Sequence, residues 1–214
     1  MTLIEQTNEV KCGTEGAEWQ KLWNYLQSNH LDSRENYEYV CSLVDIENVA
    51  DYYIIQMWCS NHDLDNVREF KISGGKWRYI LYDLDLTLTS DAQGSAEYLL
   101  GKFNSGLYTL NALIYRLLEN EEFSAFFAKR LETMLAGTLS EENASAVLEA
   151  MYDRLKSDMV YNCERWAGTD SSGKLRYKTY TGWEKAVKSL TGLIKGRNEV
   201  LAEEYDNLIE GRSG

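Results

Sequence analysis

Acidic and amide side chains are concentrated in one short stretch of this chain. Asp63, Asp65 and Asn66 stand close together in one polar segment, and Asp83 and Asp85 end an apolar run that comes soon after it. Carboxylates that lie close together repel one another unless a cation neutralises them. Oxygen ligands of this kind suit magnesium, calcium or manganese rather than zinc. The stretch therefore predicts a divalent-metal site, with turn formation and helix capping as the alternative roles of each residue.

A β-hairpin would bring these side chains together. Two short runs of β-type sequence, residues 67–72 and 76–82, are joined by Ser73-Gly74-Gly75, and a short connection containing glycine predicts a hairpin. Opposed residues in such a hairpin lie on the same face. The expected register is defined by these opposed pairs: Ile72 with Lys76, Val67 with Leu81, and Asp65 with Asp83. Asp83 and Asp85 would also face the same side if the backbone there stays extended.

The same stretch carries a set of short motifs. In chain order they are Asp51-Tyr52-Tyr53, Asn61-x-Asp63, Asn66, Gly74-Gly75-Lys76-Trp77-Arg78 and Tyr82-Asp83-Leu84-Asp85. Together they resemble the catalytic segment of the CotH kinase family of spore-coat proteins, which are atypical protein kinases. The resemblance implies that Asp63 is catalytic and orients the substrate hydroxyl. It also implies that Asn66 and Asp83 bind the nucleotide through a metal ion, with Asp85 as an adjacent metal ligand.

The family resemblance implies a reaction and leaves parts of it open. The reaction is transfer of the γ-phosphate of ATP, with Mg²⁺ or Mn²⁺, to Ser or Thr hydroxyls of a protein substrate. Only two residues separate Asp63 from Asn66, fewer than in the family pattern, which leaves the identity of the metal-binding Asn open. The resemblance runs from about residue 17 to 209 and covers the later part of the family domain. The N-terminal lobe, the other wall of the nucleotide cleft, has no counterpart here, so catalysis by this chain alone is left open.

Two other functions are compatible with the sequence. One is a non-catalytic module derived from a kinase lobe, which binds a protein or carbohydrate partner through its aromatic surface. The other is a carboxylate-metal hydrolase, although no water-activating arrangement is visible. His62, beside the carboxylates, could act as a base or ligand or could be an ordinary loop residue, and the family pattern gives it no role. An extracellular, spore-surface or cell-surface location is implied by the resemblance alone.

Composition limits the classes of partner. The formal net charge of −12 argues against a nucleic-acid surface, which needs basic patches, and it disfavours polyphosphates that no metal ion screens. No apolar run approaches the length of a membrane span. The four cysteines, Cys12, Cys41, Cys59 and Cys163, have no paired metal spacing and are expected to be free thiols.

Helical periodicity predicts the scaffold around the acidic stretch. Helices are expected at residues 17–28, from 32, from 45 to the loop at Asn61, at 107–118, at 121–135, from 140, at 181–195 and at 197–209. Residues 86–106 show the least regular pattern. The expected fold class is mainly α with a small β-hairpin (α+β), similar to a protein-kinase C-terminal lobe. Residues 1–16 are expected to be an N-terminal tail or linker, and residues 17–214 a single domain.

Overall fold

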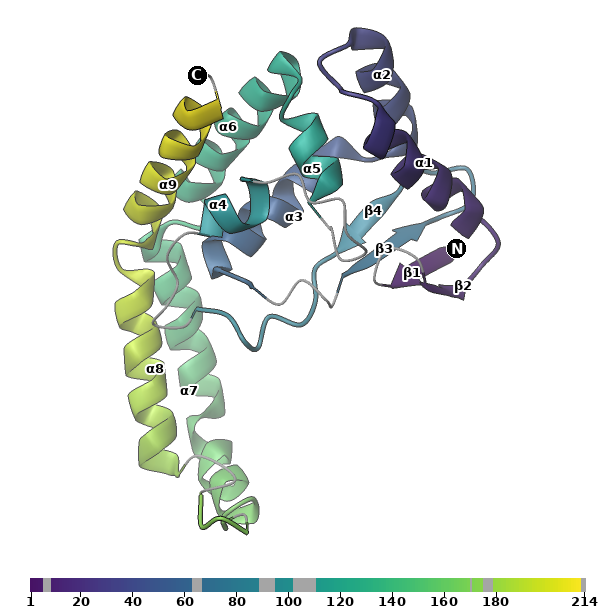
Figure 1. Ribbon diagram of the computed structural model, residues 1–214. Coiled ribbons are helices and arrows are strands. Elements are labelled where there is room, and N and C mark those ends of the chain that lie inside the picture. The colour runs from purple at the N-terminus through teal and green to yellow at the C-terminus, as the bar shows by residue number, and fades with distance from the viewer. Residues whose placement is uncertain are drawn as a thin grey trace. The chain divides into compact units, whose positions relative to one another are not determined.

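The computed structural model describes residues 1–5, 9–62, 67–88, 95–101, 111–169, 171–174 and 179–212. Its strands are β1 (Thr2–Glu5), β2 (Glu9–Cys12), β3 (Arg68–Lys71) and β4 (Arg78–Ile80). Its helices are α1 (Gly16–Ser28), α2 (Arg34–Leu43), α3 (Ile46–Cys59), α4 (Ser95–Leu100), α5 (Ala112–Leu117), α6 (Glu121–Ala136), α7 (Glu141–Arg165), α8 (Tyr180–Ile194) and α9 (Arg197–Arg212). The elements are labelled in Figure 1. This mainly helical fold with a small antiparallel sheet confirms the predicted fold class.

The chain forms two compact units. The first contains residues 1–133 and 200–214, and the second contains residues 134–199. All four strands and the acidic stretch belong to the first unit. The second unit is built mainly from α7 and α8, which lie side by side (Figure 1).

The predicted hairpin is present in the predicted register. β3 and β4 pair antiparallel, with Arg68 opposite Ile80, Glu69 opposite Tyr79 and Phe70 opposite Arg78. The turn between the strands is closed by the Gly75 N–H, which donates to the Ile72 carbonyl at 2.7 Å. Gly74 has a φ of +75°, a left-handed conformation that glycine adopts without steric cost. The glycines therefore serve the turn, as the sequence predicted.

The expectation of a tail at residues 1–16 is wrong for its strand-forming part. β1 pairs with β3, with Ile4 opposite Glu69, and β2 adds on the far side of β1. The result is a four-stranded sheet in the order β2-β1-β3-β4 rather than an isolated hairpin. Both new strands are short and carry few apolar residues, so local periodicity does not reveal them. Their pairing partner is distant in the sequence, and only the tertiary fold selects it.

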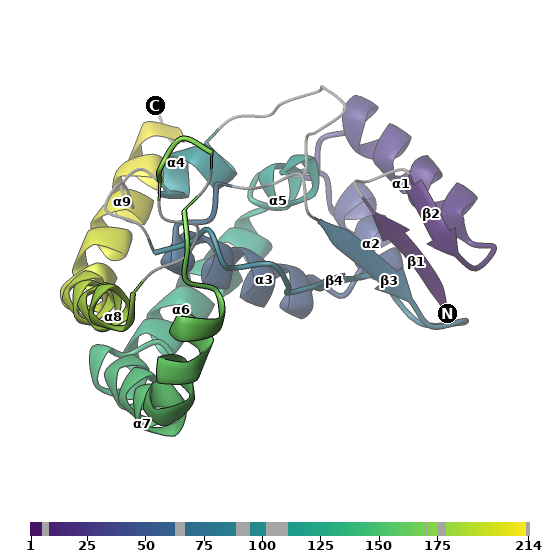
Figure 2. The ribbon, with the colours of Figure 1, turned by 90° about the horizontal axis from the view of Figure 1, so that it is seen from below.

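One face of this sheet packs against α1 and α3, whose ribbons lie beside it in Figure 2. An aromatic cluster fills this contact. The Trp19 ring of α1 lies 5.1 Å from that of Trp77, the residue immediately before β4. Tyr79 of β4 stacks on Tyr52 of α3 with ring centroids 4.6 Å apart, and Tyr53 meets Tyr79 edge-on. All five rings are at least nine-tenths buried. This cluster fixes the hairpin to the helix that precedes the acidic loop.

Asn48, in the first turn of α3, joins that helix to β4 through the backbone. Its side-chain Oδ1 accepts from the Tyr79 N–H at 2.6 Å, and its Nδ2 donates to the Tyr79 carbonyl at 3.3 Å. Asp45 caps the same helix by accepting from the Asn48 N–H at 3.1 Å. The hairpin is thus attached to the helix by polar as well as aromatic contacts.

We expect Asn48→Ala to destabilise the fold. The substitution removes both hydrogen bonds to Tyr79 and leaves a half-buried strand edge without its partner, which should cost about 1–3 kcal/mol. For a chain of this length that corresponds to a melting temperature lower by roughly 3–10 °C. Circular dichroism melting measures the change. Asn24→Ala, on the exposed side of α1, is the matched control, and equal melting of both variants would contradict the assignment.

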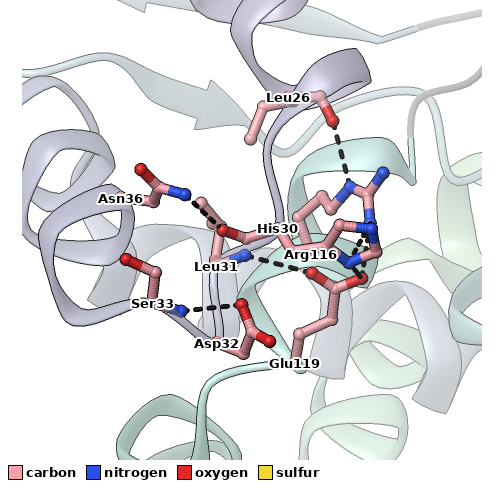
Figure 3. Close-up of polar contacts among 8 residues, drawn as sticks. All are labelled: Leu26, His30, Leu31, Asp32, Ser33, Asn36, Arg116 and Glu119. Carbon is pink, nitrogen blue, oxygen red and sulfur yellow. Dashed lines mark hydrogen bonds and ion pairs between the residues drawn. The ribbon is translucent and has the colours of Figure 1, made fainter.

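A buried polar cluster connects α5 to the loop between α1 and α2 (Figure 3). Arg116 is 7% exposed, and its Nε donates to the Leu26 carbonyl at 3.0 Å. Its Nη1 lies 2.6 Å from Oε1 of Glu119 and 2.8 Å from Nδ1 of His30. The second Glu119 oxygen accepts from the Leu31 N–H at 3.1 Å. The buried guanidinium is therefore paired and hydrogen-bonded, as a charge in the protein interior must be.

The second unit is a long helical hairpin. The Ser140 side chain caps α7 by accepting from the Asn143 N–H at 3.2 Å, and α8 begins with a similar Thr179 cap. Gly196, at φ +73°, separates α8 from α9 as the sequence predicted. Much of α7 faces solvent, and its Met151 side chain is 55% exposed. Among the helices that the structure describes, none is both long and apolar enough to cross a membrane.

Candidate active site

The acidic loop leaves α3 through a strained but well-supported turn. Ser60 has a φ of +51°, an uncommon value for a residue other than glycine. The next residue, Asn61, is 3% exposed, and its side chain donates to Oε1 of Gln56 at 2.7 Å while its backbone N–H donates to the Gln56 carbonyl at 3.0 Å. Because strain of this kind persists only where the surroundings impose it, the helix end fixes the direction in which the loop starts.

His62 is the last described residue before the loop, and it contacts α4. The Tyr98 hydroxyl donates to the His62 carbonyl at 3.0 Å, and the two rings lie 4.4 Å apart at 46°. His62 itself is exposed. The irregular segment predicted at residues 86–106 therefore contains a short helix that contacts His62.

The segment after β4 folds back to the end of α3. The Leu88 N–H donates to the Cys59 carbonyl at 2.8 Å, which satisfies one of the last carbonyls of the helix. Within the segment, the Thr87 hydroxyl donates to the Leu84 carbonyl at 2.7 Å. The residues that follow Asp83 and the residues that precede Asp63 are thereby held beside each other.

Asp83 has an unusual backbone conformation. Its φ of +57° lies in the left-handed region, and its side chain is exposed. Non-glycine residues in such conformations cluster at active sites, ligand clamps and switches, where the surrounding structure maintains them. The backbone at Asp83 is consequently not extended, so the condition under which Asp83 and Asp85 would face the same side is not met. Asp85 is also exposed and lies in a turn.

The structure describes only part of the predicted site. Asp63, Asp65 and Asn66 lie outside the described residues, so their contacts and the opposition of Asp65 and Asp83 stay predictions. Within the part of the chain that is described, no group of three or more His, Cys, Asp or Glu side chains is placed to hold a metal ion. Asp83 and Asp85 supply exposed carboxylate oxygens, which are suitable Mg²⁺ or Mn²⁺ ligands.

A cation lies next to Asp83. The Arg68 guanidinium sits 4.1 Å above the Tyr82 ring, and its Nε donates to Oε1 of Glu5 at 2.7 Å. The pKa of Arg68 is raised, chiefly by this hydrogen bond, with smaller contributions from Tyr82 and Asp83. Arg68 therefore places positive charge beside the carboxylate at the end of the hairpin, on the sheet face opposite the aromatic cluster.

Glu69 is a feature that sequence reasoning missed. It is fully buried between Ile4 and Tyr79, and neither of its carboxylate oxygens has a hydrogen-bond partner among the residues that the structure describes. Burial raises its pKa to about 8, and the pKa values of Tyr52 and Tyr53 are raised as well, mainly by burial and in part by this carboxylate. Glu69 is therefore protonated at neutral pH. The alternation of the strand gave no signal for this burial, because it would place Phe70 rather than Glu69 on the buried face.

All four cysteines are free thiols, as predicted, and Cys59 and Cys163 are buried whereas Cys12 is exposed. Asp51, part of one of the motifs, forms a two-pronged ion pair with Arg130 of α6, at 2.6 and 2.8 Å. It therefore joins α3 to α6 rather than contributing to the acidic loop.

Comparison with known proteins identifies one family. A family model described as CotH kinase protein matches residues 4–201. The match begins inside β1, earlier than the resemblance near residue 17 suggested, which agrees with the sheet topology. No curated protein matches the chain, and no solved structure matches it. Because the family model covers most of the sequence and indicates a kinase-like protein, the chain belongs to the CotH kinase family.

Proposed function

We propose that this protein is a phosphotransferase that moves the γ-phosphate of ATP to Ser or Thr hydroxyls of a protein substrate. In this proposal Asp63 orients the acceptor hydroxyl, and Asn66 and Asp83 hold the divalent ion on the nucleotide, with Asp85 adjacent. The kinase-like family supports the reaction class. The same proposal includes a protein as the acceptor, a further part that forms the opposing wall of the nucleotide cleft, and an extracellular or spore-surface location.

One observation carries the proposal. The hairpin register and the Leu88–Cys59 hydrogen bond bring the start of the acidic loop and the Asp83 segment to the same end of α3. The residues that lead into the acidic loop and the segment that follows Asp83 thus start from one rigid support, which is the kind of support that positioning of a metal-bound nucleotide requires. The left-handed backbone at Asp83 adds a strained residue at this point.

The chemistry follows from charge and position. A divalent ion, when bound, neutralises the charge on the phosphates and on the carboxylates that hold it. The residues of the chain then have two tasks: Asp83 and Asn66 fix the ion, and Asp63 accepts a hydrogen bond from the attacking hydroxyl and aligns it. A net charge of −12 makes binding of ATP without metal unfavourable. Binding should therefore depend strictly on Mg²⁺ or Mn²⁺.

Thermal melting of the full chain with ATP and MgCl₂ tests the proposal. At a nucleotide concentration about 100-fold above Kd, binding to the folded state stabilises it by about 2.7 kcal/mol, or roughly 5–10 °C for this length. We expect this shift in the wild type and none in Asp83→Ala. ATP with EDTA is the control for non-specific effects. Wild type and Asp83→Ala melting alike with and without nucleotide would refute nucleotide binding at this site.

A non-catalytic binding module is the second candidate. It is favoured by the apolar side chains that α7 exposes, among them Val147 at 52% and Met151 at 55%. Exposed apolar groups on one helix face are typical of surfaces that bind another protein. Absence of a nucleotide-dependent shift, together with an unchanged fold, would favour this reading over phosphoryl transfer.

A further inference from the structure

We propose that Tyr98 is a positioning residue for the acidic loop, and through that loop for Asp63. The inference rests on the proposed phosphoryl transfer and assigns a role to a residue of α4, outside the acidic stretch and its motifs.

The short helix α4 is a fixed support. Four of its residues are buried: Ser95, Ala96, Leu99 and Leu100. Its first turn is held by Glu204 of α9, which accepts from the Ser95 hydroxyl at 2.9 Å and from the Ala96 N–H at 3.3 Å. A side chain that projects from this helix is therefore attached to the core of the first unit, rather than to a freely moving loop.

Tyr98 is the residue that projects. Its side chain is 47% exposed, so packing in the core does not account for its position. It contacts His62 in two ways: its hydroxyl donates a hydrogen bond to the His62 carbonyl, and its ring lies 4.4 Å from the His62 ring. Since His62 is also exposed, the pair lies on the surface beside the loop. The contact stabilises a particular local geometry and adds little to the core.

The hydrogen bond to the His62 carbonyl has a direct geometric consequence for Asp63. The His62 C=O and the Asp63 N–H belong to one planar peptide unit, so an orientation imposed on the carbonyl fixes the plane from which Asp63 starts. Upstream, Asn61 is already held by Gln56. Tyr98 extends the supported part of the chain by one residue, up to the residue that would orient the acceptor. Small displacements of such a residue reduce turnover strongly, because the reacting groups must be aligned.

This role predicts a specific kinetic pattern. Tyr98→Phe keeps the ring contact and loses the hydrogen bond, and we expect kcat to fall about 10-fold. Tyr98→Ala loses both contacts, and we expect a fall of about 100-fold. KM for ATP should change less than about 3-fold, because Asp83 and its segment are not altered. Tyr161→Phe and Tyr161→Ala, at a side chain 73% exposed on α7, are the matched controls and should keep wild-type kcat.

The test is transfer of radiolabelled phosphate from ATP, with MnCl₂ or MgCl₂, to the full chain and to Ser/Thr-rich peptides. It is paired with NMR of the imidazole protons, since His30 and His62 are the only histidines. Tyr98→Ala should shift the His62 signals and leave those of His30 in place. If the wild type transfers phosphate and both Tyr98 variants keep the wild-type kcat, the role of Tyr98 is overturned and phosphoryl transfer is not. Absence of transfer by the wild type overturns phosphoryl transfer and this role together.

Discussion

Urea unfolding of Glu69→Gln is expected to show a weaker dependence on pH than unfolding of the wild type. Glu69 is protonated in the folded protein, where burial raises its pKa to about 8, and it ionises near the ordinary glutamate pKa of 4.5 when the chain unfolds. Its contribution to the free energy of unfolding is therefore fully present below about pH 4.5 and is lost as pH rises through about 8. Between about pH 5 and pH 9 the wild type should lose about 4 kcal/mol that the variant does not.

The comparison between wild type and variant isolates this one group. Other titrating residues contribute equally to both proteins, so the difference between their slopes belongs to Glu69. Glu149→Gln, exposed on α7, should retain the wild-type pH dependence. Equal slopes for wild type and Glu69→Gln would mean that the carboxyl group is hydrated or paired in solution. The absolute stability of the variant at one pH is not the test, because a buried amide has unsatisfied donors of its own.

Asp83→Asn is expected to lower the rate of phosphoryl transfer about 100-fold or more, equivalent to ~3 kcal/mol of transition-state stabilisation. The amide keeps the size of the side chain and removes the charge that would hold the divalent ion. Because Asp83 is exposed, the fold should be retained. Raising the Mn²⁺ concentration should recover part of the lost rate if the defect is metal binding.

The control for this result is Asp153→Asn. Asp153 is an exposed residue of α7 that pairs with Lys156 at 2.8 Å, and exposed pairs of this kind contribute little to stability. It should keep wild-type kcat and wild-type dependence on Mn²⁺. A wild-type rate in Asp83→Asn would remove Asp83 from the metal set and leave the family resemblance without its metal-binding residue at this position.

The sequence by itself determined the elements whose signals are local. The spacing around Ser73-Gly74-Gly75 predicted both the hairpin and its register, because a turn with glycine in a left-handed conformation leaves few ways to pair the flanking strands. Helical periodicity likewise predicted α1, α3 and α6 to within about two residues. The family resemblance rested on motifs inside the same local stretch and is confirmed by the family model.

The tertiary structure alone decided the features that depend on distant partners. β1 became a strand because β3 was available as its neighbour, and packing of the sheet against α1 and α3 turned Glu69 inward near Tyr52, Tyr53 and Tyr79. The sequence of the strand could not reveal this, because the apolar residue is expected on the buried face. In the structure Phe70 lies on the opposite face at intermediate exposure. The left-handed backbone at Asp83 and the hydrogen bond from Tyr98 to His62 are likewise set by contacts between separated segments. Local sequence specifies turns and helix faces, whereas the packing of those elements selects which polar groups are buried, strained or brought together.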